Sequence, residues 1–493
     1  MTKRVHFVSL GCPKNRVDSE VMLGKLVSDG HELSDSPEDA HVIVVNTCGF
    51  IDAAKEESVQ AILDAADQKE NGRCEQLIVS GCLSQRYAPE LEKDIPEVDH
   101  FLGTGNFMEI DEVVGKAKST KKSHPRLPIV WSGEGQEDAK DWQRKPRKLG
   151  RNAIEPYHYG DPDGADGVYI PDPDFTISAN MPRVSTLPSY SAYLKISEGC
   201  SNTCSFCIIP KLRGPQRSRP VRDVVLEFEA LLERGAVEIN LIAQDLCAYG
   251  RDLVPRQNLA QLLRALDKRA QEHPKPVWIR CLYAYPRGLT REVVEVLASA
   301  KCIVPYLDMP LQHISDGILR RMRRGRGGDG TRKVLYRLRD NIPDIHLRTT
   351  FITGLPGESE ADFKELCEFV KEMDFAHMGV FAYSPEEDTP AAAMSMQVPK
   401  ELAEERKDIL MAIQKEISAR RQAAMIGQQV DVLVEGISEE SELLVQGRHA
   451  GQAPEIDGLT YITSGHLNPG DVVPVQIMES SEYDLAGECL LEP

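Results

Sequence analysis

Cysteine is the residue of this chain best suited to metal or redox chemistry, and three of its twelve cysteines stand close together. Cys200, Cys204 and Cys207 form a Cys-x3-Cys-x2-Cys loop. Three neighbouring thiolates can hold one iron–sulfur cube, because thiolate is a soft ligand suited to such clusters. Three protein ligands for four irons leave one iron open for substrate chemistry. The alternative is a zinc site, but structural zinc usually takes four protein ligands, and no fourth Cys or His follows at zinc-finger spacing.

A second set of cysteines is spread along the chain, each directly after a short apolar run that is typical of a buried strand. The cysteines are Cys12, Cys48 and Cys82, and the runs are Val5–Leu10, Val42–Asn46 and Leu77–Ser80. Successive members are about one βαβ crossover apart. Because the carboxyl ends of parallel strands share the edge of a sheet where ligands bind, these side chains can converge. The alternative is that each is simply a small buried residue.

The other cysteines show neither spacing, and we interpret them as core or incidental thiols. They are Cys74, which precedes its strand, and Cys247, Cys281, Cys302, Cys367 and Cys489. In a reducing compartment, clustered cysteines indicate metal or redox chemistry before disulfides.

The elements that must position these cysteines fall into five parts. They are an N-terminal α/β domain (1–118), an irregular insertion or linker rich in Pro, Gly, Asp and Lys (119–189), a second α/β domain (190–398), a connecting helix (399–421) and a small all-β domain (422–493). In the first part, the strand-like runs alternate with helical stretches at Asp18–Ser28 and Asp52–Asp67. That alternation predicts a parallel, doubly wound sheet covered on both faces.

The second α/β domain contains six strand candidates separated by helical segments such as Arg222–Arg234 and Ala361–Met373. The strands are Ala192–Ser197, Glu238–Ala243, Val277–Tyr283, Val304–Met309, Leu347–Thr353 and His377–Ser384. Six β-then-α units fit an open, partial (βα)6 barrel better than a closed eight-stranded one. The three-cysteine loop follows its first strand directly.

The C-terminal part begins after an amphipathic helix that runs from Pro399 to about Arg421. Its short strands alternate with Gly-rich or acidic turns, which predicts a small β-barrel. The strands are Val430–Gly436, Leu443–Gly447, Leu459–Thr463 and Val472–Met478.

Composition and charge narrow the classes of function. A chain of 493 residues is too long for one core, and 41% hydrophobic with 27% charged residues is typical of a globular protein. No apolar run reaches the ~18 residues of a membrane span. The apolar stretch at the start of the chain is too short for a signal peptide, so we expect a cytoplasmic protein. The net charge of −19 argues against a general nucleic-acid binder. From Gln422 onward, Arg448 is the one basic residue among thirteen acidic ones.

The loop Glu198-Gly-Cys-Ser-Asn-Thr-Cys-Ser-Phe-Cys207, with the six βα units after it, resembles the radical S-adenosylmethionine superfamily. The resemblance implies that the open iron binds the amino and carboxylate groups of S-adenosylmethionine. One electron from the cluster would then yield methionine and a 5′-deoxyadenosyl radical. Phe206 stands where that family usually has an aromatic residue beside the adenine.

The stretch Thr350–Glu358 resembles the adenine-binding strand motif of the same superfamily, Gly-x-Ile-x-Gly-x-x-Glu, through Ile352 and Gly354. It departs in two ways: Thr350 replaces the first Gly, and Glu358 is one place late. The alternative is a Gly-Pro turn that ends a strand.

Four polar or aromatic residues are also expected at the cofactor mouth, because they follow barrel strands, where active sites of such barrels lie. They are Gln244, Asp245, Tyr283 and Tyr285. A packing role is an equal alternative for them.

The order of the parts is similar to the methylthiotransferase family: three cysteines in an N-terminal flavodoxin-like domain, a radical loop and a terminal TRAM barrel. The resemblance implies that Cys12, Cys48 and Cys82 hold a second [4Fe–4S] cluster, whose open iron carries the sulfur to be transferred. An external electron donor and a sulfur donor would be required. The insertion at 119–189 is longer than that family's usual linker.

Three motifs resemble the branch of this family that modifies an aspartate of small-ribosomal-subunit protein twelve. They are Ser9-Leu-Gly-Cys-Pro-Lys-Asn15 with Val17-Asp-Ser-Glu20, Asp308-Met-Pro-Leu-Gln-His313 and Gln452-Ala-Pro-Glu-Ile-Asp-Gly458. Arg16 departs from a common Leu. The resemblance implies hydrogen abstraction from the aspartate β-carbon and transfer of a methylthio group.

The acidic tail favours the same substrate independently, because an RNA-binding barrel should be basic, whereas this one would attract a Lys/Arg-rich ribosomal protein. A purely solubilising acidic face is the bland alternative. Two other functions stay open: a tRNA adenosine methylthiotransferase, and a non-catalytic iron–sulfur carrier or scaffold. A carrier, however, needs no six-strand domain behind its cysteine loop.

Overall fold

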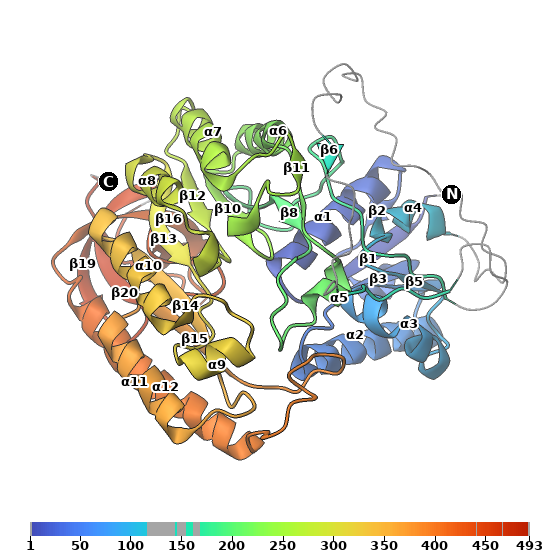
Figure 1. Ribbon diagram of the computed structural model, residues 1–493. Helices are drawn as coiled ribbons and strands as arrows, with labels where there is room; N and C mark the ends of the chain where they lie inside the picture. Colours follow the sequence, from blue (N-terminus) through green and yellow to red (C-terminus); the bar gives the residue numbers. More distant parts are fainter. Residues whose placement is uncertain are drawn as a thin grey trace.

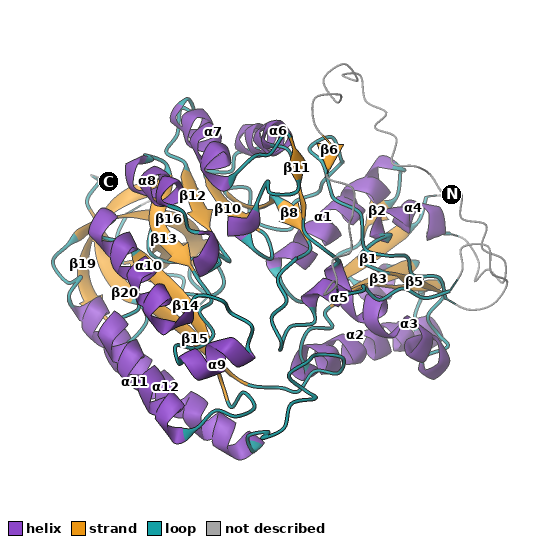
Figure 2. Cartoon of the chain, viewed as in Figure 1, coloured by secondary structure: helices purple, strands orange, loops and turns teal. Residues whose placement is uncertain are grey.

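The computed structural model describes residues 2–115, 143–144, 154–160, 168–439, 441–465 and 467–491. Most of the expected irregular insertion, and also Glu440, lie outside these ranges. Helices flank two parallel sheets, and a small barrel completes the chain (Figures 1 and 2). Among the described residues, no helix combines the length and apolarity that crossing a bilayer requires.

The N-terminal domain is built on a five-stranded parallel sheet with the order β2-β1-β3-β4-β5. This is the order of flavodoxin-like doubly wound sheets, so the fold prediction is confirmed. Its central strands are buried along their whole length, and their residues 42–45 and 77–79 are apolar. The elements are β1 (Arg4–Ser9), α1 (Pro13–Ser28), β2 (Glu32–Leu33), β3 (Val42–Thr47), α2 (Asp52–Asn71), β4 (Gln76–Gly81), α3 (Cys82–Asp94), β5 (His100–Leu102) and α4 (Ile110–Val113).

The central domain is an open six-stranded parallel sheet in the order β15-β14-β13-β12-β10-β7, which confirms the partial (βα)6 barrel. Its strands are β7 (Ser191–Lys195), β10 (Glu238–Ile242), β12 (Trp278–Cys281), β13 (Ile303–Asp308), β14 (His346–Thr353) and β15 (His377–Ala382). Its helices are α5 (Ile209–Arg213), α6 (Val221–Glu233), α7 (Leu259–Gln271), α8 (Arg291–Ser299), α9 (Asp316–Arg321), α10 (Gly327–Asn341) and α11 (Glu360–Met373). Two small ribbons, β8 (Ser197–Glu198) with β9 (Arg217–Ser218) and β6 (Gln143–Arg144) with β11 (Leu253–Val254), are antiparallel.

The C-terminal domain follows the long helix α12 (Lys400–Ala423) and is a closed barrel in the order β16-β17-β18-β20-β19. Its strands are β16 (Gln429–Ile437), β17 (Val445–His449), β18 (Thr460–Ile462), β19 (Val472–Ser480) and β20 (Leu485–Cys489). Alternate residues such as Val432, Val434, Val473 and Val475 fill its interior.

Three local expectations need correction. Helix α1 begins at Pro13 rather than Asp18, because proline fits the first helical position, where its missing N–H has no partner to lose. The strand expected to reach Tyr283 ends at Cys281, and Tyr283 has a left-handed φ of 63°. Strands β2, β5 and β20 were not expected at all.

The three domains share packing rather than standing as separate units. One hydrophobic cluster joins Val21 of α1 and Tyr193 of β7 to Ala453 in the loop after β17. Ile170 and Ile177, from the stretch expected to be an irregular insertion, are buried in the clusters of the N-terminal and central domains. The described part of that stretch therefore contributes residues to the core.

Candidate functional site

The three N-terminal cysteines lie at the carboxyl edge of the first sheet, and their loops touch. Cys12 caps α1 directly after β1, and Cys82 opens α3 directly after β4. A Cβ on Gly11 would lie 2.9 Å from Cys48 Cβ and 3.2 Å from Cys48 Sγ, and one on Gly49 would lie 3.0 Å from the carbonyl carbon of Cys82. The loops can approach this closely only because both positions lack a side chain. The expected convergence is therefore present in the backbone.

This site is unfavourable for bare thiolates. Burial, together with the charges of Cys82 and Cys12, raises the pKa of the Cys48 thiol to about 12. Burial also raises the pKa of Cys82, although the guanidinium of Arg213 acts in the opposite direction. Three thiolates can share such a place only with a cation, because a bound metal offsets both their desolvation and their mutual repulsion.

The set of Cys200, Cys204 and Cys207 lies in the loop that follows β7 and β8. The Cys207 N–H donates to the Cys204 carbonyl at 3.2 Å, and the Asn202 N–H donates to Cys200 Sγ at 3.4 Å. Arg324, which follows α9, donates to Cys204 Sγ at 3.7 Å. Burial raises the pKa of Cys200 to about 12 and also that of Cys207. Both cysteine sets therefore present buried or half-buried thiols with cationic neighbours.

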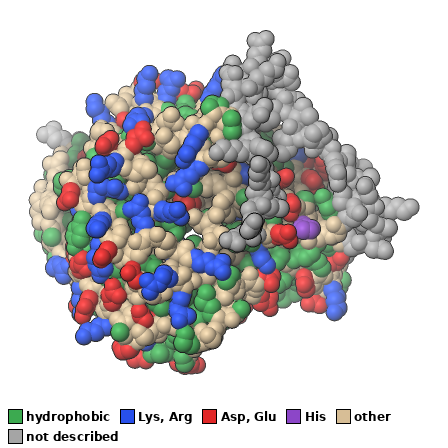
Figure 3. Space-filling model, viewed as in Figure 1, with side chains coloured by type: hydrophobic (Ala, Val, Ile, Leu, Met, Phe, Trp, Pro, Cys, Tyr) green, Lys and Arg blue, Asp and Glu red, His purple; other side chains and the backbone are tan. Residues whose placement is uncertain are grey.

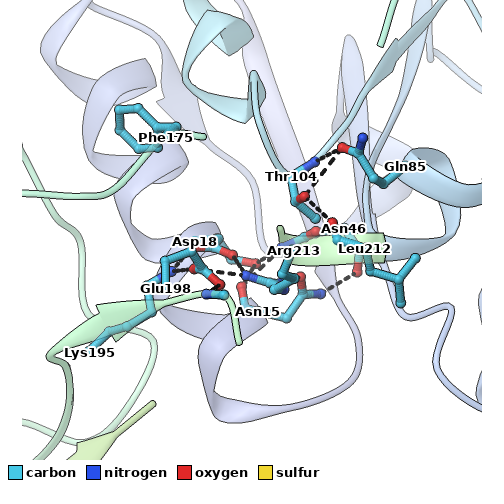
Figure 4. Close-up of polar contacts among 12 residues, drawn as sticks. Asn15, Asp18, Asn46, Gln85, Thr104, Phe175, Lys195, Glu198, Leu212 and Arg213 are labelled. Atoms are coloured by element: carbon cyan, nitrogen blue, oxygen red, sulfur yellow. Dashed lines mark hydrogen bonds and ion pairs between the residues drawn. The ribbon is translucent and has the colours of Figure 1, made fainter. Parts of the chain in front are cut away.

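Helix α5 connects the two sets. It begins two residues after Cys207, and its Ile208–Leu212 side packs on Cys82. At its end, Arg213 is 2% exposed and reaches into the N-terminal domain (Figure 4). Arg213 donates to Asp18 at 2.7 Å and to Asn15 at 3.0 Å.

The same guanidinium also pairs with Glu198 at 3.1 Å, and Lys195 bonds both Glu198 and Asp18. Burial alone would raise the pKa of Glu198, but the charges of Lys195 and Arg213 hold it below the usual range. The network therefore joins the start of α1, next to Cys12, to the residue two places before Cys200.

A second bridge lies between Lys14 and Tyr283. Lys14 is 7% exposed, and its ammonium lies 3.0 Å from the centre of the Tyr283 ring. Burial lowers the pKa of Lys14 to about 8, although the charge of Cys12 acts in the opposite direction. Two residues further on, Tyr285 lies under the Arg324 guanidinium at 4.2 Å. Tyr283 therefore contacts Lys14, close to Cys12, while Tyr285 contacts Arg324, which donates to Cys204.

The structure brings together two of the residues expected to contact the adenine. Phe206 and Ile352 both pack on one small hydrophobic cluster with Leu355. Gly354 instead faces α12: a Cβ there would lie 2.3 Å from Ala403 Cβ, and its φ is 77°. Its position is explained by helix packing, which matches the alternative interpretation of a strand-ending turn.

Polar atoms around the set of Cys200, Cys204 and Cys207 are left without partners, as expected of a site that takes a polar ligand. Gln244 donates to Glu198 at 2.7 Å, while its Oε1 atom is buried and unpaired. The Oε1 atom of Gln312 is unpaired as well. The backbone of Gln312 forms a β-bridge with Phe351 of β14. Asp245 accepts from Asn202 at 2.8 Å, so it orients the cysteine loop.

The donor sets fit clusters of several irons. Within the described ranges, no three His, Cys, Asp or Glu side chains close on a single metal ion. A four-iron cluster binds each thiolate through a different iron, so its ligands lie further apart than those of one ion. Three soft thiols per set, each buried or half-buried, with unpaired polar atoms beside one of the sets, match that requirement.

Sequence reasoning missed Arg213, Lys195 and Asp18 as parts of the site. Arg213 and Asp18 are 195 positions apart, so no local spacing could reveal their contact. Lys14 stood inside a quoted motif, but nothing in the sequence showed that its ammonium is buried.

The charge of the barrel is less uniform than a residue count indicates. Arg448, its basic residue, is 1% exposed and pairs with Glu238 of β10 at 2.7 Å. Glu455 pairs with Arg16 of α1 at 2.9 Å, so this barrel loop also contacts the N-terminal domain. Among the described residues of the barrel, the acidic side chains that stay exposed without an ion pair are Asp431, Glu439, Glu442, Glu479 and Glu488.

The central domain presents charge of the opposite sign. In Figure 3, Lys and Arg side chains gather over α8, α9 and α10. Arg291, Arg320, Arg323 and Arg326 are exposed there. A charged partner would therefore meet very different fields on the two domains.

Comparison with known proteins places each domain. Residues 4–103 match a family described as "Uncharacterized protein family UPF0004", 194–370 match the radical SAM superfamily, and 426–490 match the TRAM domain. The radical S-adenosylmethionine methyltransferase TsrM from Kitasatospora setae, solved with cobalamin and a [4Fe–4S] cluster bound, is 15% identical with a TM-score of 0.52. The structural alignment covers 79% of this chain and 74% of the TsrM chain. The fold is that of a radical SAM protein with an additional α/β domain and a TRAM barrel.

Full-length relatives define the family more narrowly. Proteins named ribosomal protein uS12 methylthiotransferase RimO are 50% identical in Anaeromyxobacter sp. (strain K) and 45% identical in Geobacter sulfurreducens. The alignments cover 99% of this chain in both cases, and 93% and 99% of those relatives. The chain belongs to this RimO methylthiotransferase family.

Proposed function

We propose that this protein is a radical SAM enzyme that adds a methylthio group to the β-carbon of an aspartate in ribosomal protein uS12. The observation that carries the proposal is the joining of two cysteine sets, from two domains, through α5 and Arg213. A carrier of clusters would need neither the second domain nor a fixed geometry between the sets. The full-length RimO relatives support the substrate.

The residues have separate roles in this proposal. Cys200, Cys204 and Cys207 hold a [4Fe–4S] cluster that binds S-adenosylmethionine, and Cys12, Cys48 and Cys82 hold a second one. Bound together, these groups supply an electron, a deoxyadenosyl radical and transferable sulfur. A radical is required because no side-chain base removes a proton from an unactivated C–H at neutral pH.

The chain's own side chains hold and orient these groups. Phe206 and Ile352 provide an apolar surface for the adenine, and the unpaired Oε1 atoms of Gln244 and Gln312 accept hydrogen bonds from polar groups of the cofactor. Arg213 fixes the distance between the two cysteine sets.

Partners follow from this chemistry. The reaction needs an external electron donor and a sulfur donor, and its substrate places it in the cytoplasm. The exposed acids of the barrel attract a basic protein and disfavour RNA binding there.

The cofactor assignment is tested on anaerobically reconstituted protein. It should contain about eight irons, four per cluster. Replacing Cys200, Cys204 and Cys207 by Ala should remove about half the iron and all S-adenosylmethionine cleavage. Loss of all the iron, or of none, would contradict two independent clusters.

The cysteine set of the N-terminal domain has its own test. Replacing Cys12, Cys48 and Cys82 by Ala should leave formation of 5′-deoxyadenosine intact and abolish sulfur insertion. If this variant still methylthiolates the substrate, those cysteines are structural.

The substrate is tested by incubating the enzyme with uS12 and with an anticodon stem-loop RNA, followed by mass spectrometry of both. Reversing Glu439 and Glu442 to Lys should slow uS12 binding and reduce its dependence on salt, because exposed charges act over a Debye length of ~10 Å at 0.1 M salt. The matched control is Glu56→Lys with Glu57→Lys on exposed positions of α2. Modification of the RNA alone would overturn the substrate assignment.

A further inference from the structure

Lys14 is a buried cation in a place that is unfavourable for one. It is the second residue of α1, at the positive end of the helix dipole, where a cation is destabilising. Its side chain is 7% exposed, so the ammonium has also lost most of its water. A residue selected for stability alone would not carry a positive charge at this position.

No carboxylate neutralises this charge directly. Among the described residues, none lies within ion-pair distance of the Lys14 ammonium, and the first turn of α1 has no acid. The carboxylates whose charges act on it are Asp308 and Glu198. Each already pairs with other cations, Asp308 with Arg348 at 3.1 Å and Glu198 with both Lys195 and Arg213. The contact of Lys14 with the Tyr283 ring offsets only part of its desolvation.

The aromatic partner of Lys14 is held firmly. Tyr283 has a φ of 63°, a conformation that costs a bulky residue free energy and persists only where the surroundings impose it. Its N–H donates to Asp308 at 3.1 Å, and its carbonyl accepts from the Leu246 N–H at 3.1 Å. The ring therefore fixes the ammonium from the side of the central domain.

The position of this pair relates it to the chemistry. Lys14 is two residues from Cys12 and comes from the N-terminal domain, while Tyr283 comes from the domain that carries Cys200, Cys204 and Cys207. Tyr285 and Arg324 continue the contact to Cys204. A cation without a carboxylate partner thus stands where the two domains meet, beside the cysteine set to which we assign sulfur.

We propose that Lys14 binds the carboxylate of the acidic side chain that is being modified. This inference rests on the proposed function and names how that site recognises its target residue. The carboxylate is one bond from the aspartate β-carbon, so holding it places the β C–H within a narrow range of positions. A charge-assisted hydrogen bond also distinguishes an acid from its amide, which carries no charge.

The test measures binding of two peptides to the reconstituted full-length protein by fluorescence anisotropy under anaerobic conditions. One peptide carries the target Asp in its ribosomal sequence, and the other carries Asn there. The variants are Lys14→Met, which keeps the length of the side chain, and Lys14→Arg, which keeps the charge. Lys25→Met is the matched control, because Lys25 lies at the other end of α1 and pairs with Asp111 at 2.6 Å.

Wild type and Lys25→Met should bind the Asp peptide about 10- to 100-fold more tightly than the Asn peptide, the range expected for one charge-assisted hydrogen bond. Lys14→Met should bind the Asp peptide as weakly as the Asn peptide, and its affinity for the Asn peptide should equal that of wild type. Lys14→Arg should restore part of the preference. Iron content of each variant reports whether the neighbouring Cys12 site is intact.

The outcomes separate the inference from the function on which it rests. If wild type methylthiolates the Asp peptide but Lys14→Met weakens both peptides equally, or neither, with full iron content, Lys14 does not bind the carboxylate. If Lys14→Met has lost iron, Lys14→Arg decides: a preference for the Asp peptide that is kept in whole or in part supports the inference, and no preference with full iron overturns it. If wild type modifies neither peptide while it cleaves S-adenosylmethionine, the proposed substrate is wrong and the inference falls with it.

Discussion

Arg213 should be the most sensitive non-cysteine position of the site, because removing it leaves two buried carboxylates with only one of their two cations. Asp18 and Glu198 are 3% and 4% exposed and pair with Arg213 at 2.7 and 3.1 Å. Removing one partner of a buried ion pair costs ~3–5 kcal/mol. Lys195 remains bonded to both carboxylates, so we expect Arg213→Met to lower the free energy of unfolding by ~3 kcal/mol, the lower end of that range.

Urea unfolding of the cluster-free protein, followed by tryptophan fluorescence at neutral pH, measures this effect. Arg264→Met is the matched control, since Arg264 is half exposed and pairs with Glu292 on the surface, where such pairs contribute little. The double variant Arg213→Met with Asp18→Asn should lose less stability than the sum of its two single variants, because the second change removes the carboxylate that the first left unpaired.

The pH dependence has a defined sign. The charges of Lys195 and Arg213 hold the pKa of Glu198 below its usual range against the effect of burial, so its contribution is present above the ordinary Glu value of about 4.3. That contribution is lost as pH falls through the lowered pKa of the folded state. The difference between wild type and Arg213→Met should therefore shrink in acid. A variant within experimental error of wild type at neutral pH would refute the reasoning.

Two further perturbations test other contacts. Gly11→Ala should lower the iron content of the N-terminal site, because its Cβ would lie 2.9 Å from that of Cys48; Gly30→Ala, with a similar φ and open space, should lose only stability and keep the iron. Glu238→Gln should lower the free energy of unfolding by ~3 kcal/mol at neutral pH, measured in urea, because buried Arg280 loses its carboxylate and Arg448 keeps only Glu435. Arg448 holds the pKa of Glu238 below its usual range despite burial, so wild type should lose this stability as pH falls below about 4.3, while the variant should not.

The large elements of the fold were predictable because strand and helix periods are local properties of sequence. The apolar runs before Cys12, Cys48 and Cys82 predicted parallel strands, and parallel strands bring their carboxyl ends to one edge. Short edge strands escaped notice because two or three residues, as in β2 and β5, carry no periodic pattern. The helix at Pro13 was placed late because its first turn is polar.

The site was predictable only as far as its cysteines. Contacts such as that of Arg213 with Asp18 join residues of different domains. The charge of an Arg does not reveal whether its side chain is buried. The tail shows the same limit: a count gives thirteen acids, but only the structure shows that Glu435, Glu455 and Asp457 are engaged with cations. Whether the remaining exposed acids steer uS12 stays a prediction.

The buried ion pairs at the domain junctions are better understood as geometric constraints than as sources of stability. Desolvating Arg213, Asp18 and Glu198 offsets most of their mutual attraction, and apolar residues of similar volume would pack at least as well. An apolar junction, however, tolerates sliding, whereas a guanidinium with fixed donors accepts only one arrangement of two carboxylates. In the proposed function, a substrate radical formed at one cysteine set takes sulfur held at the other set, so the separation of the two sets must be constant from one turnover to the next. Arg448 with Glu238 applies the same constraint to the barrel, so the acidic face of the barrel keeps a fixed direction relative to Lys14.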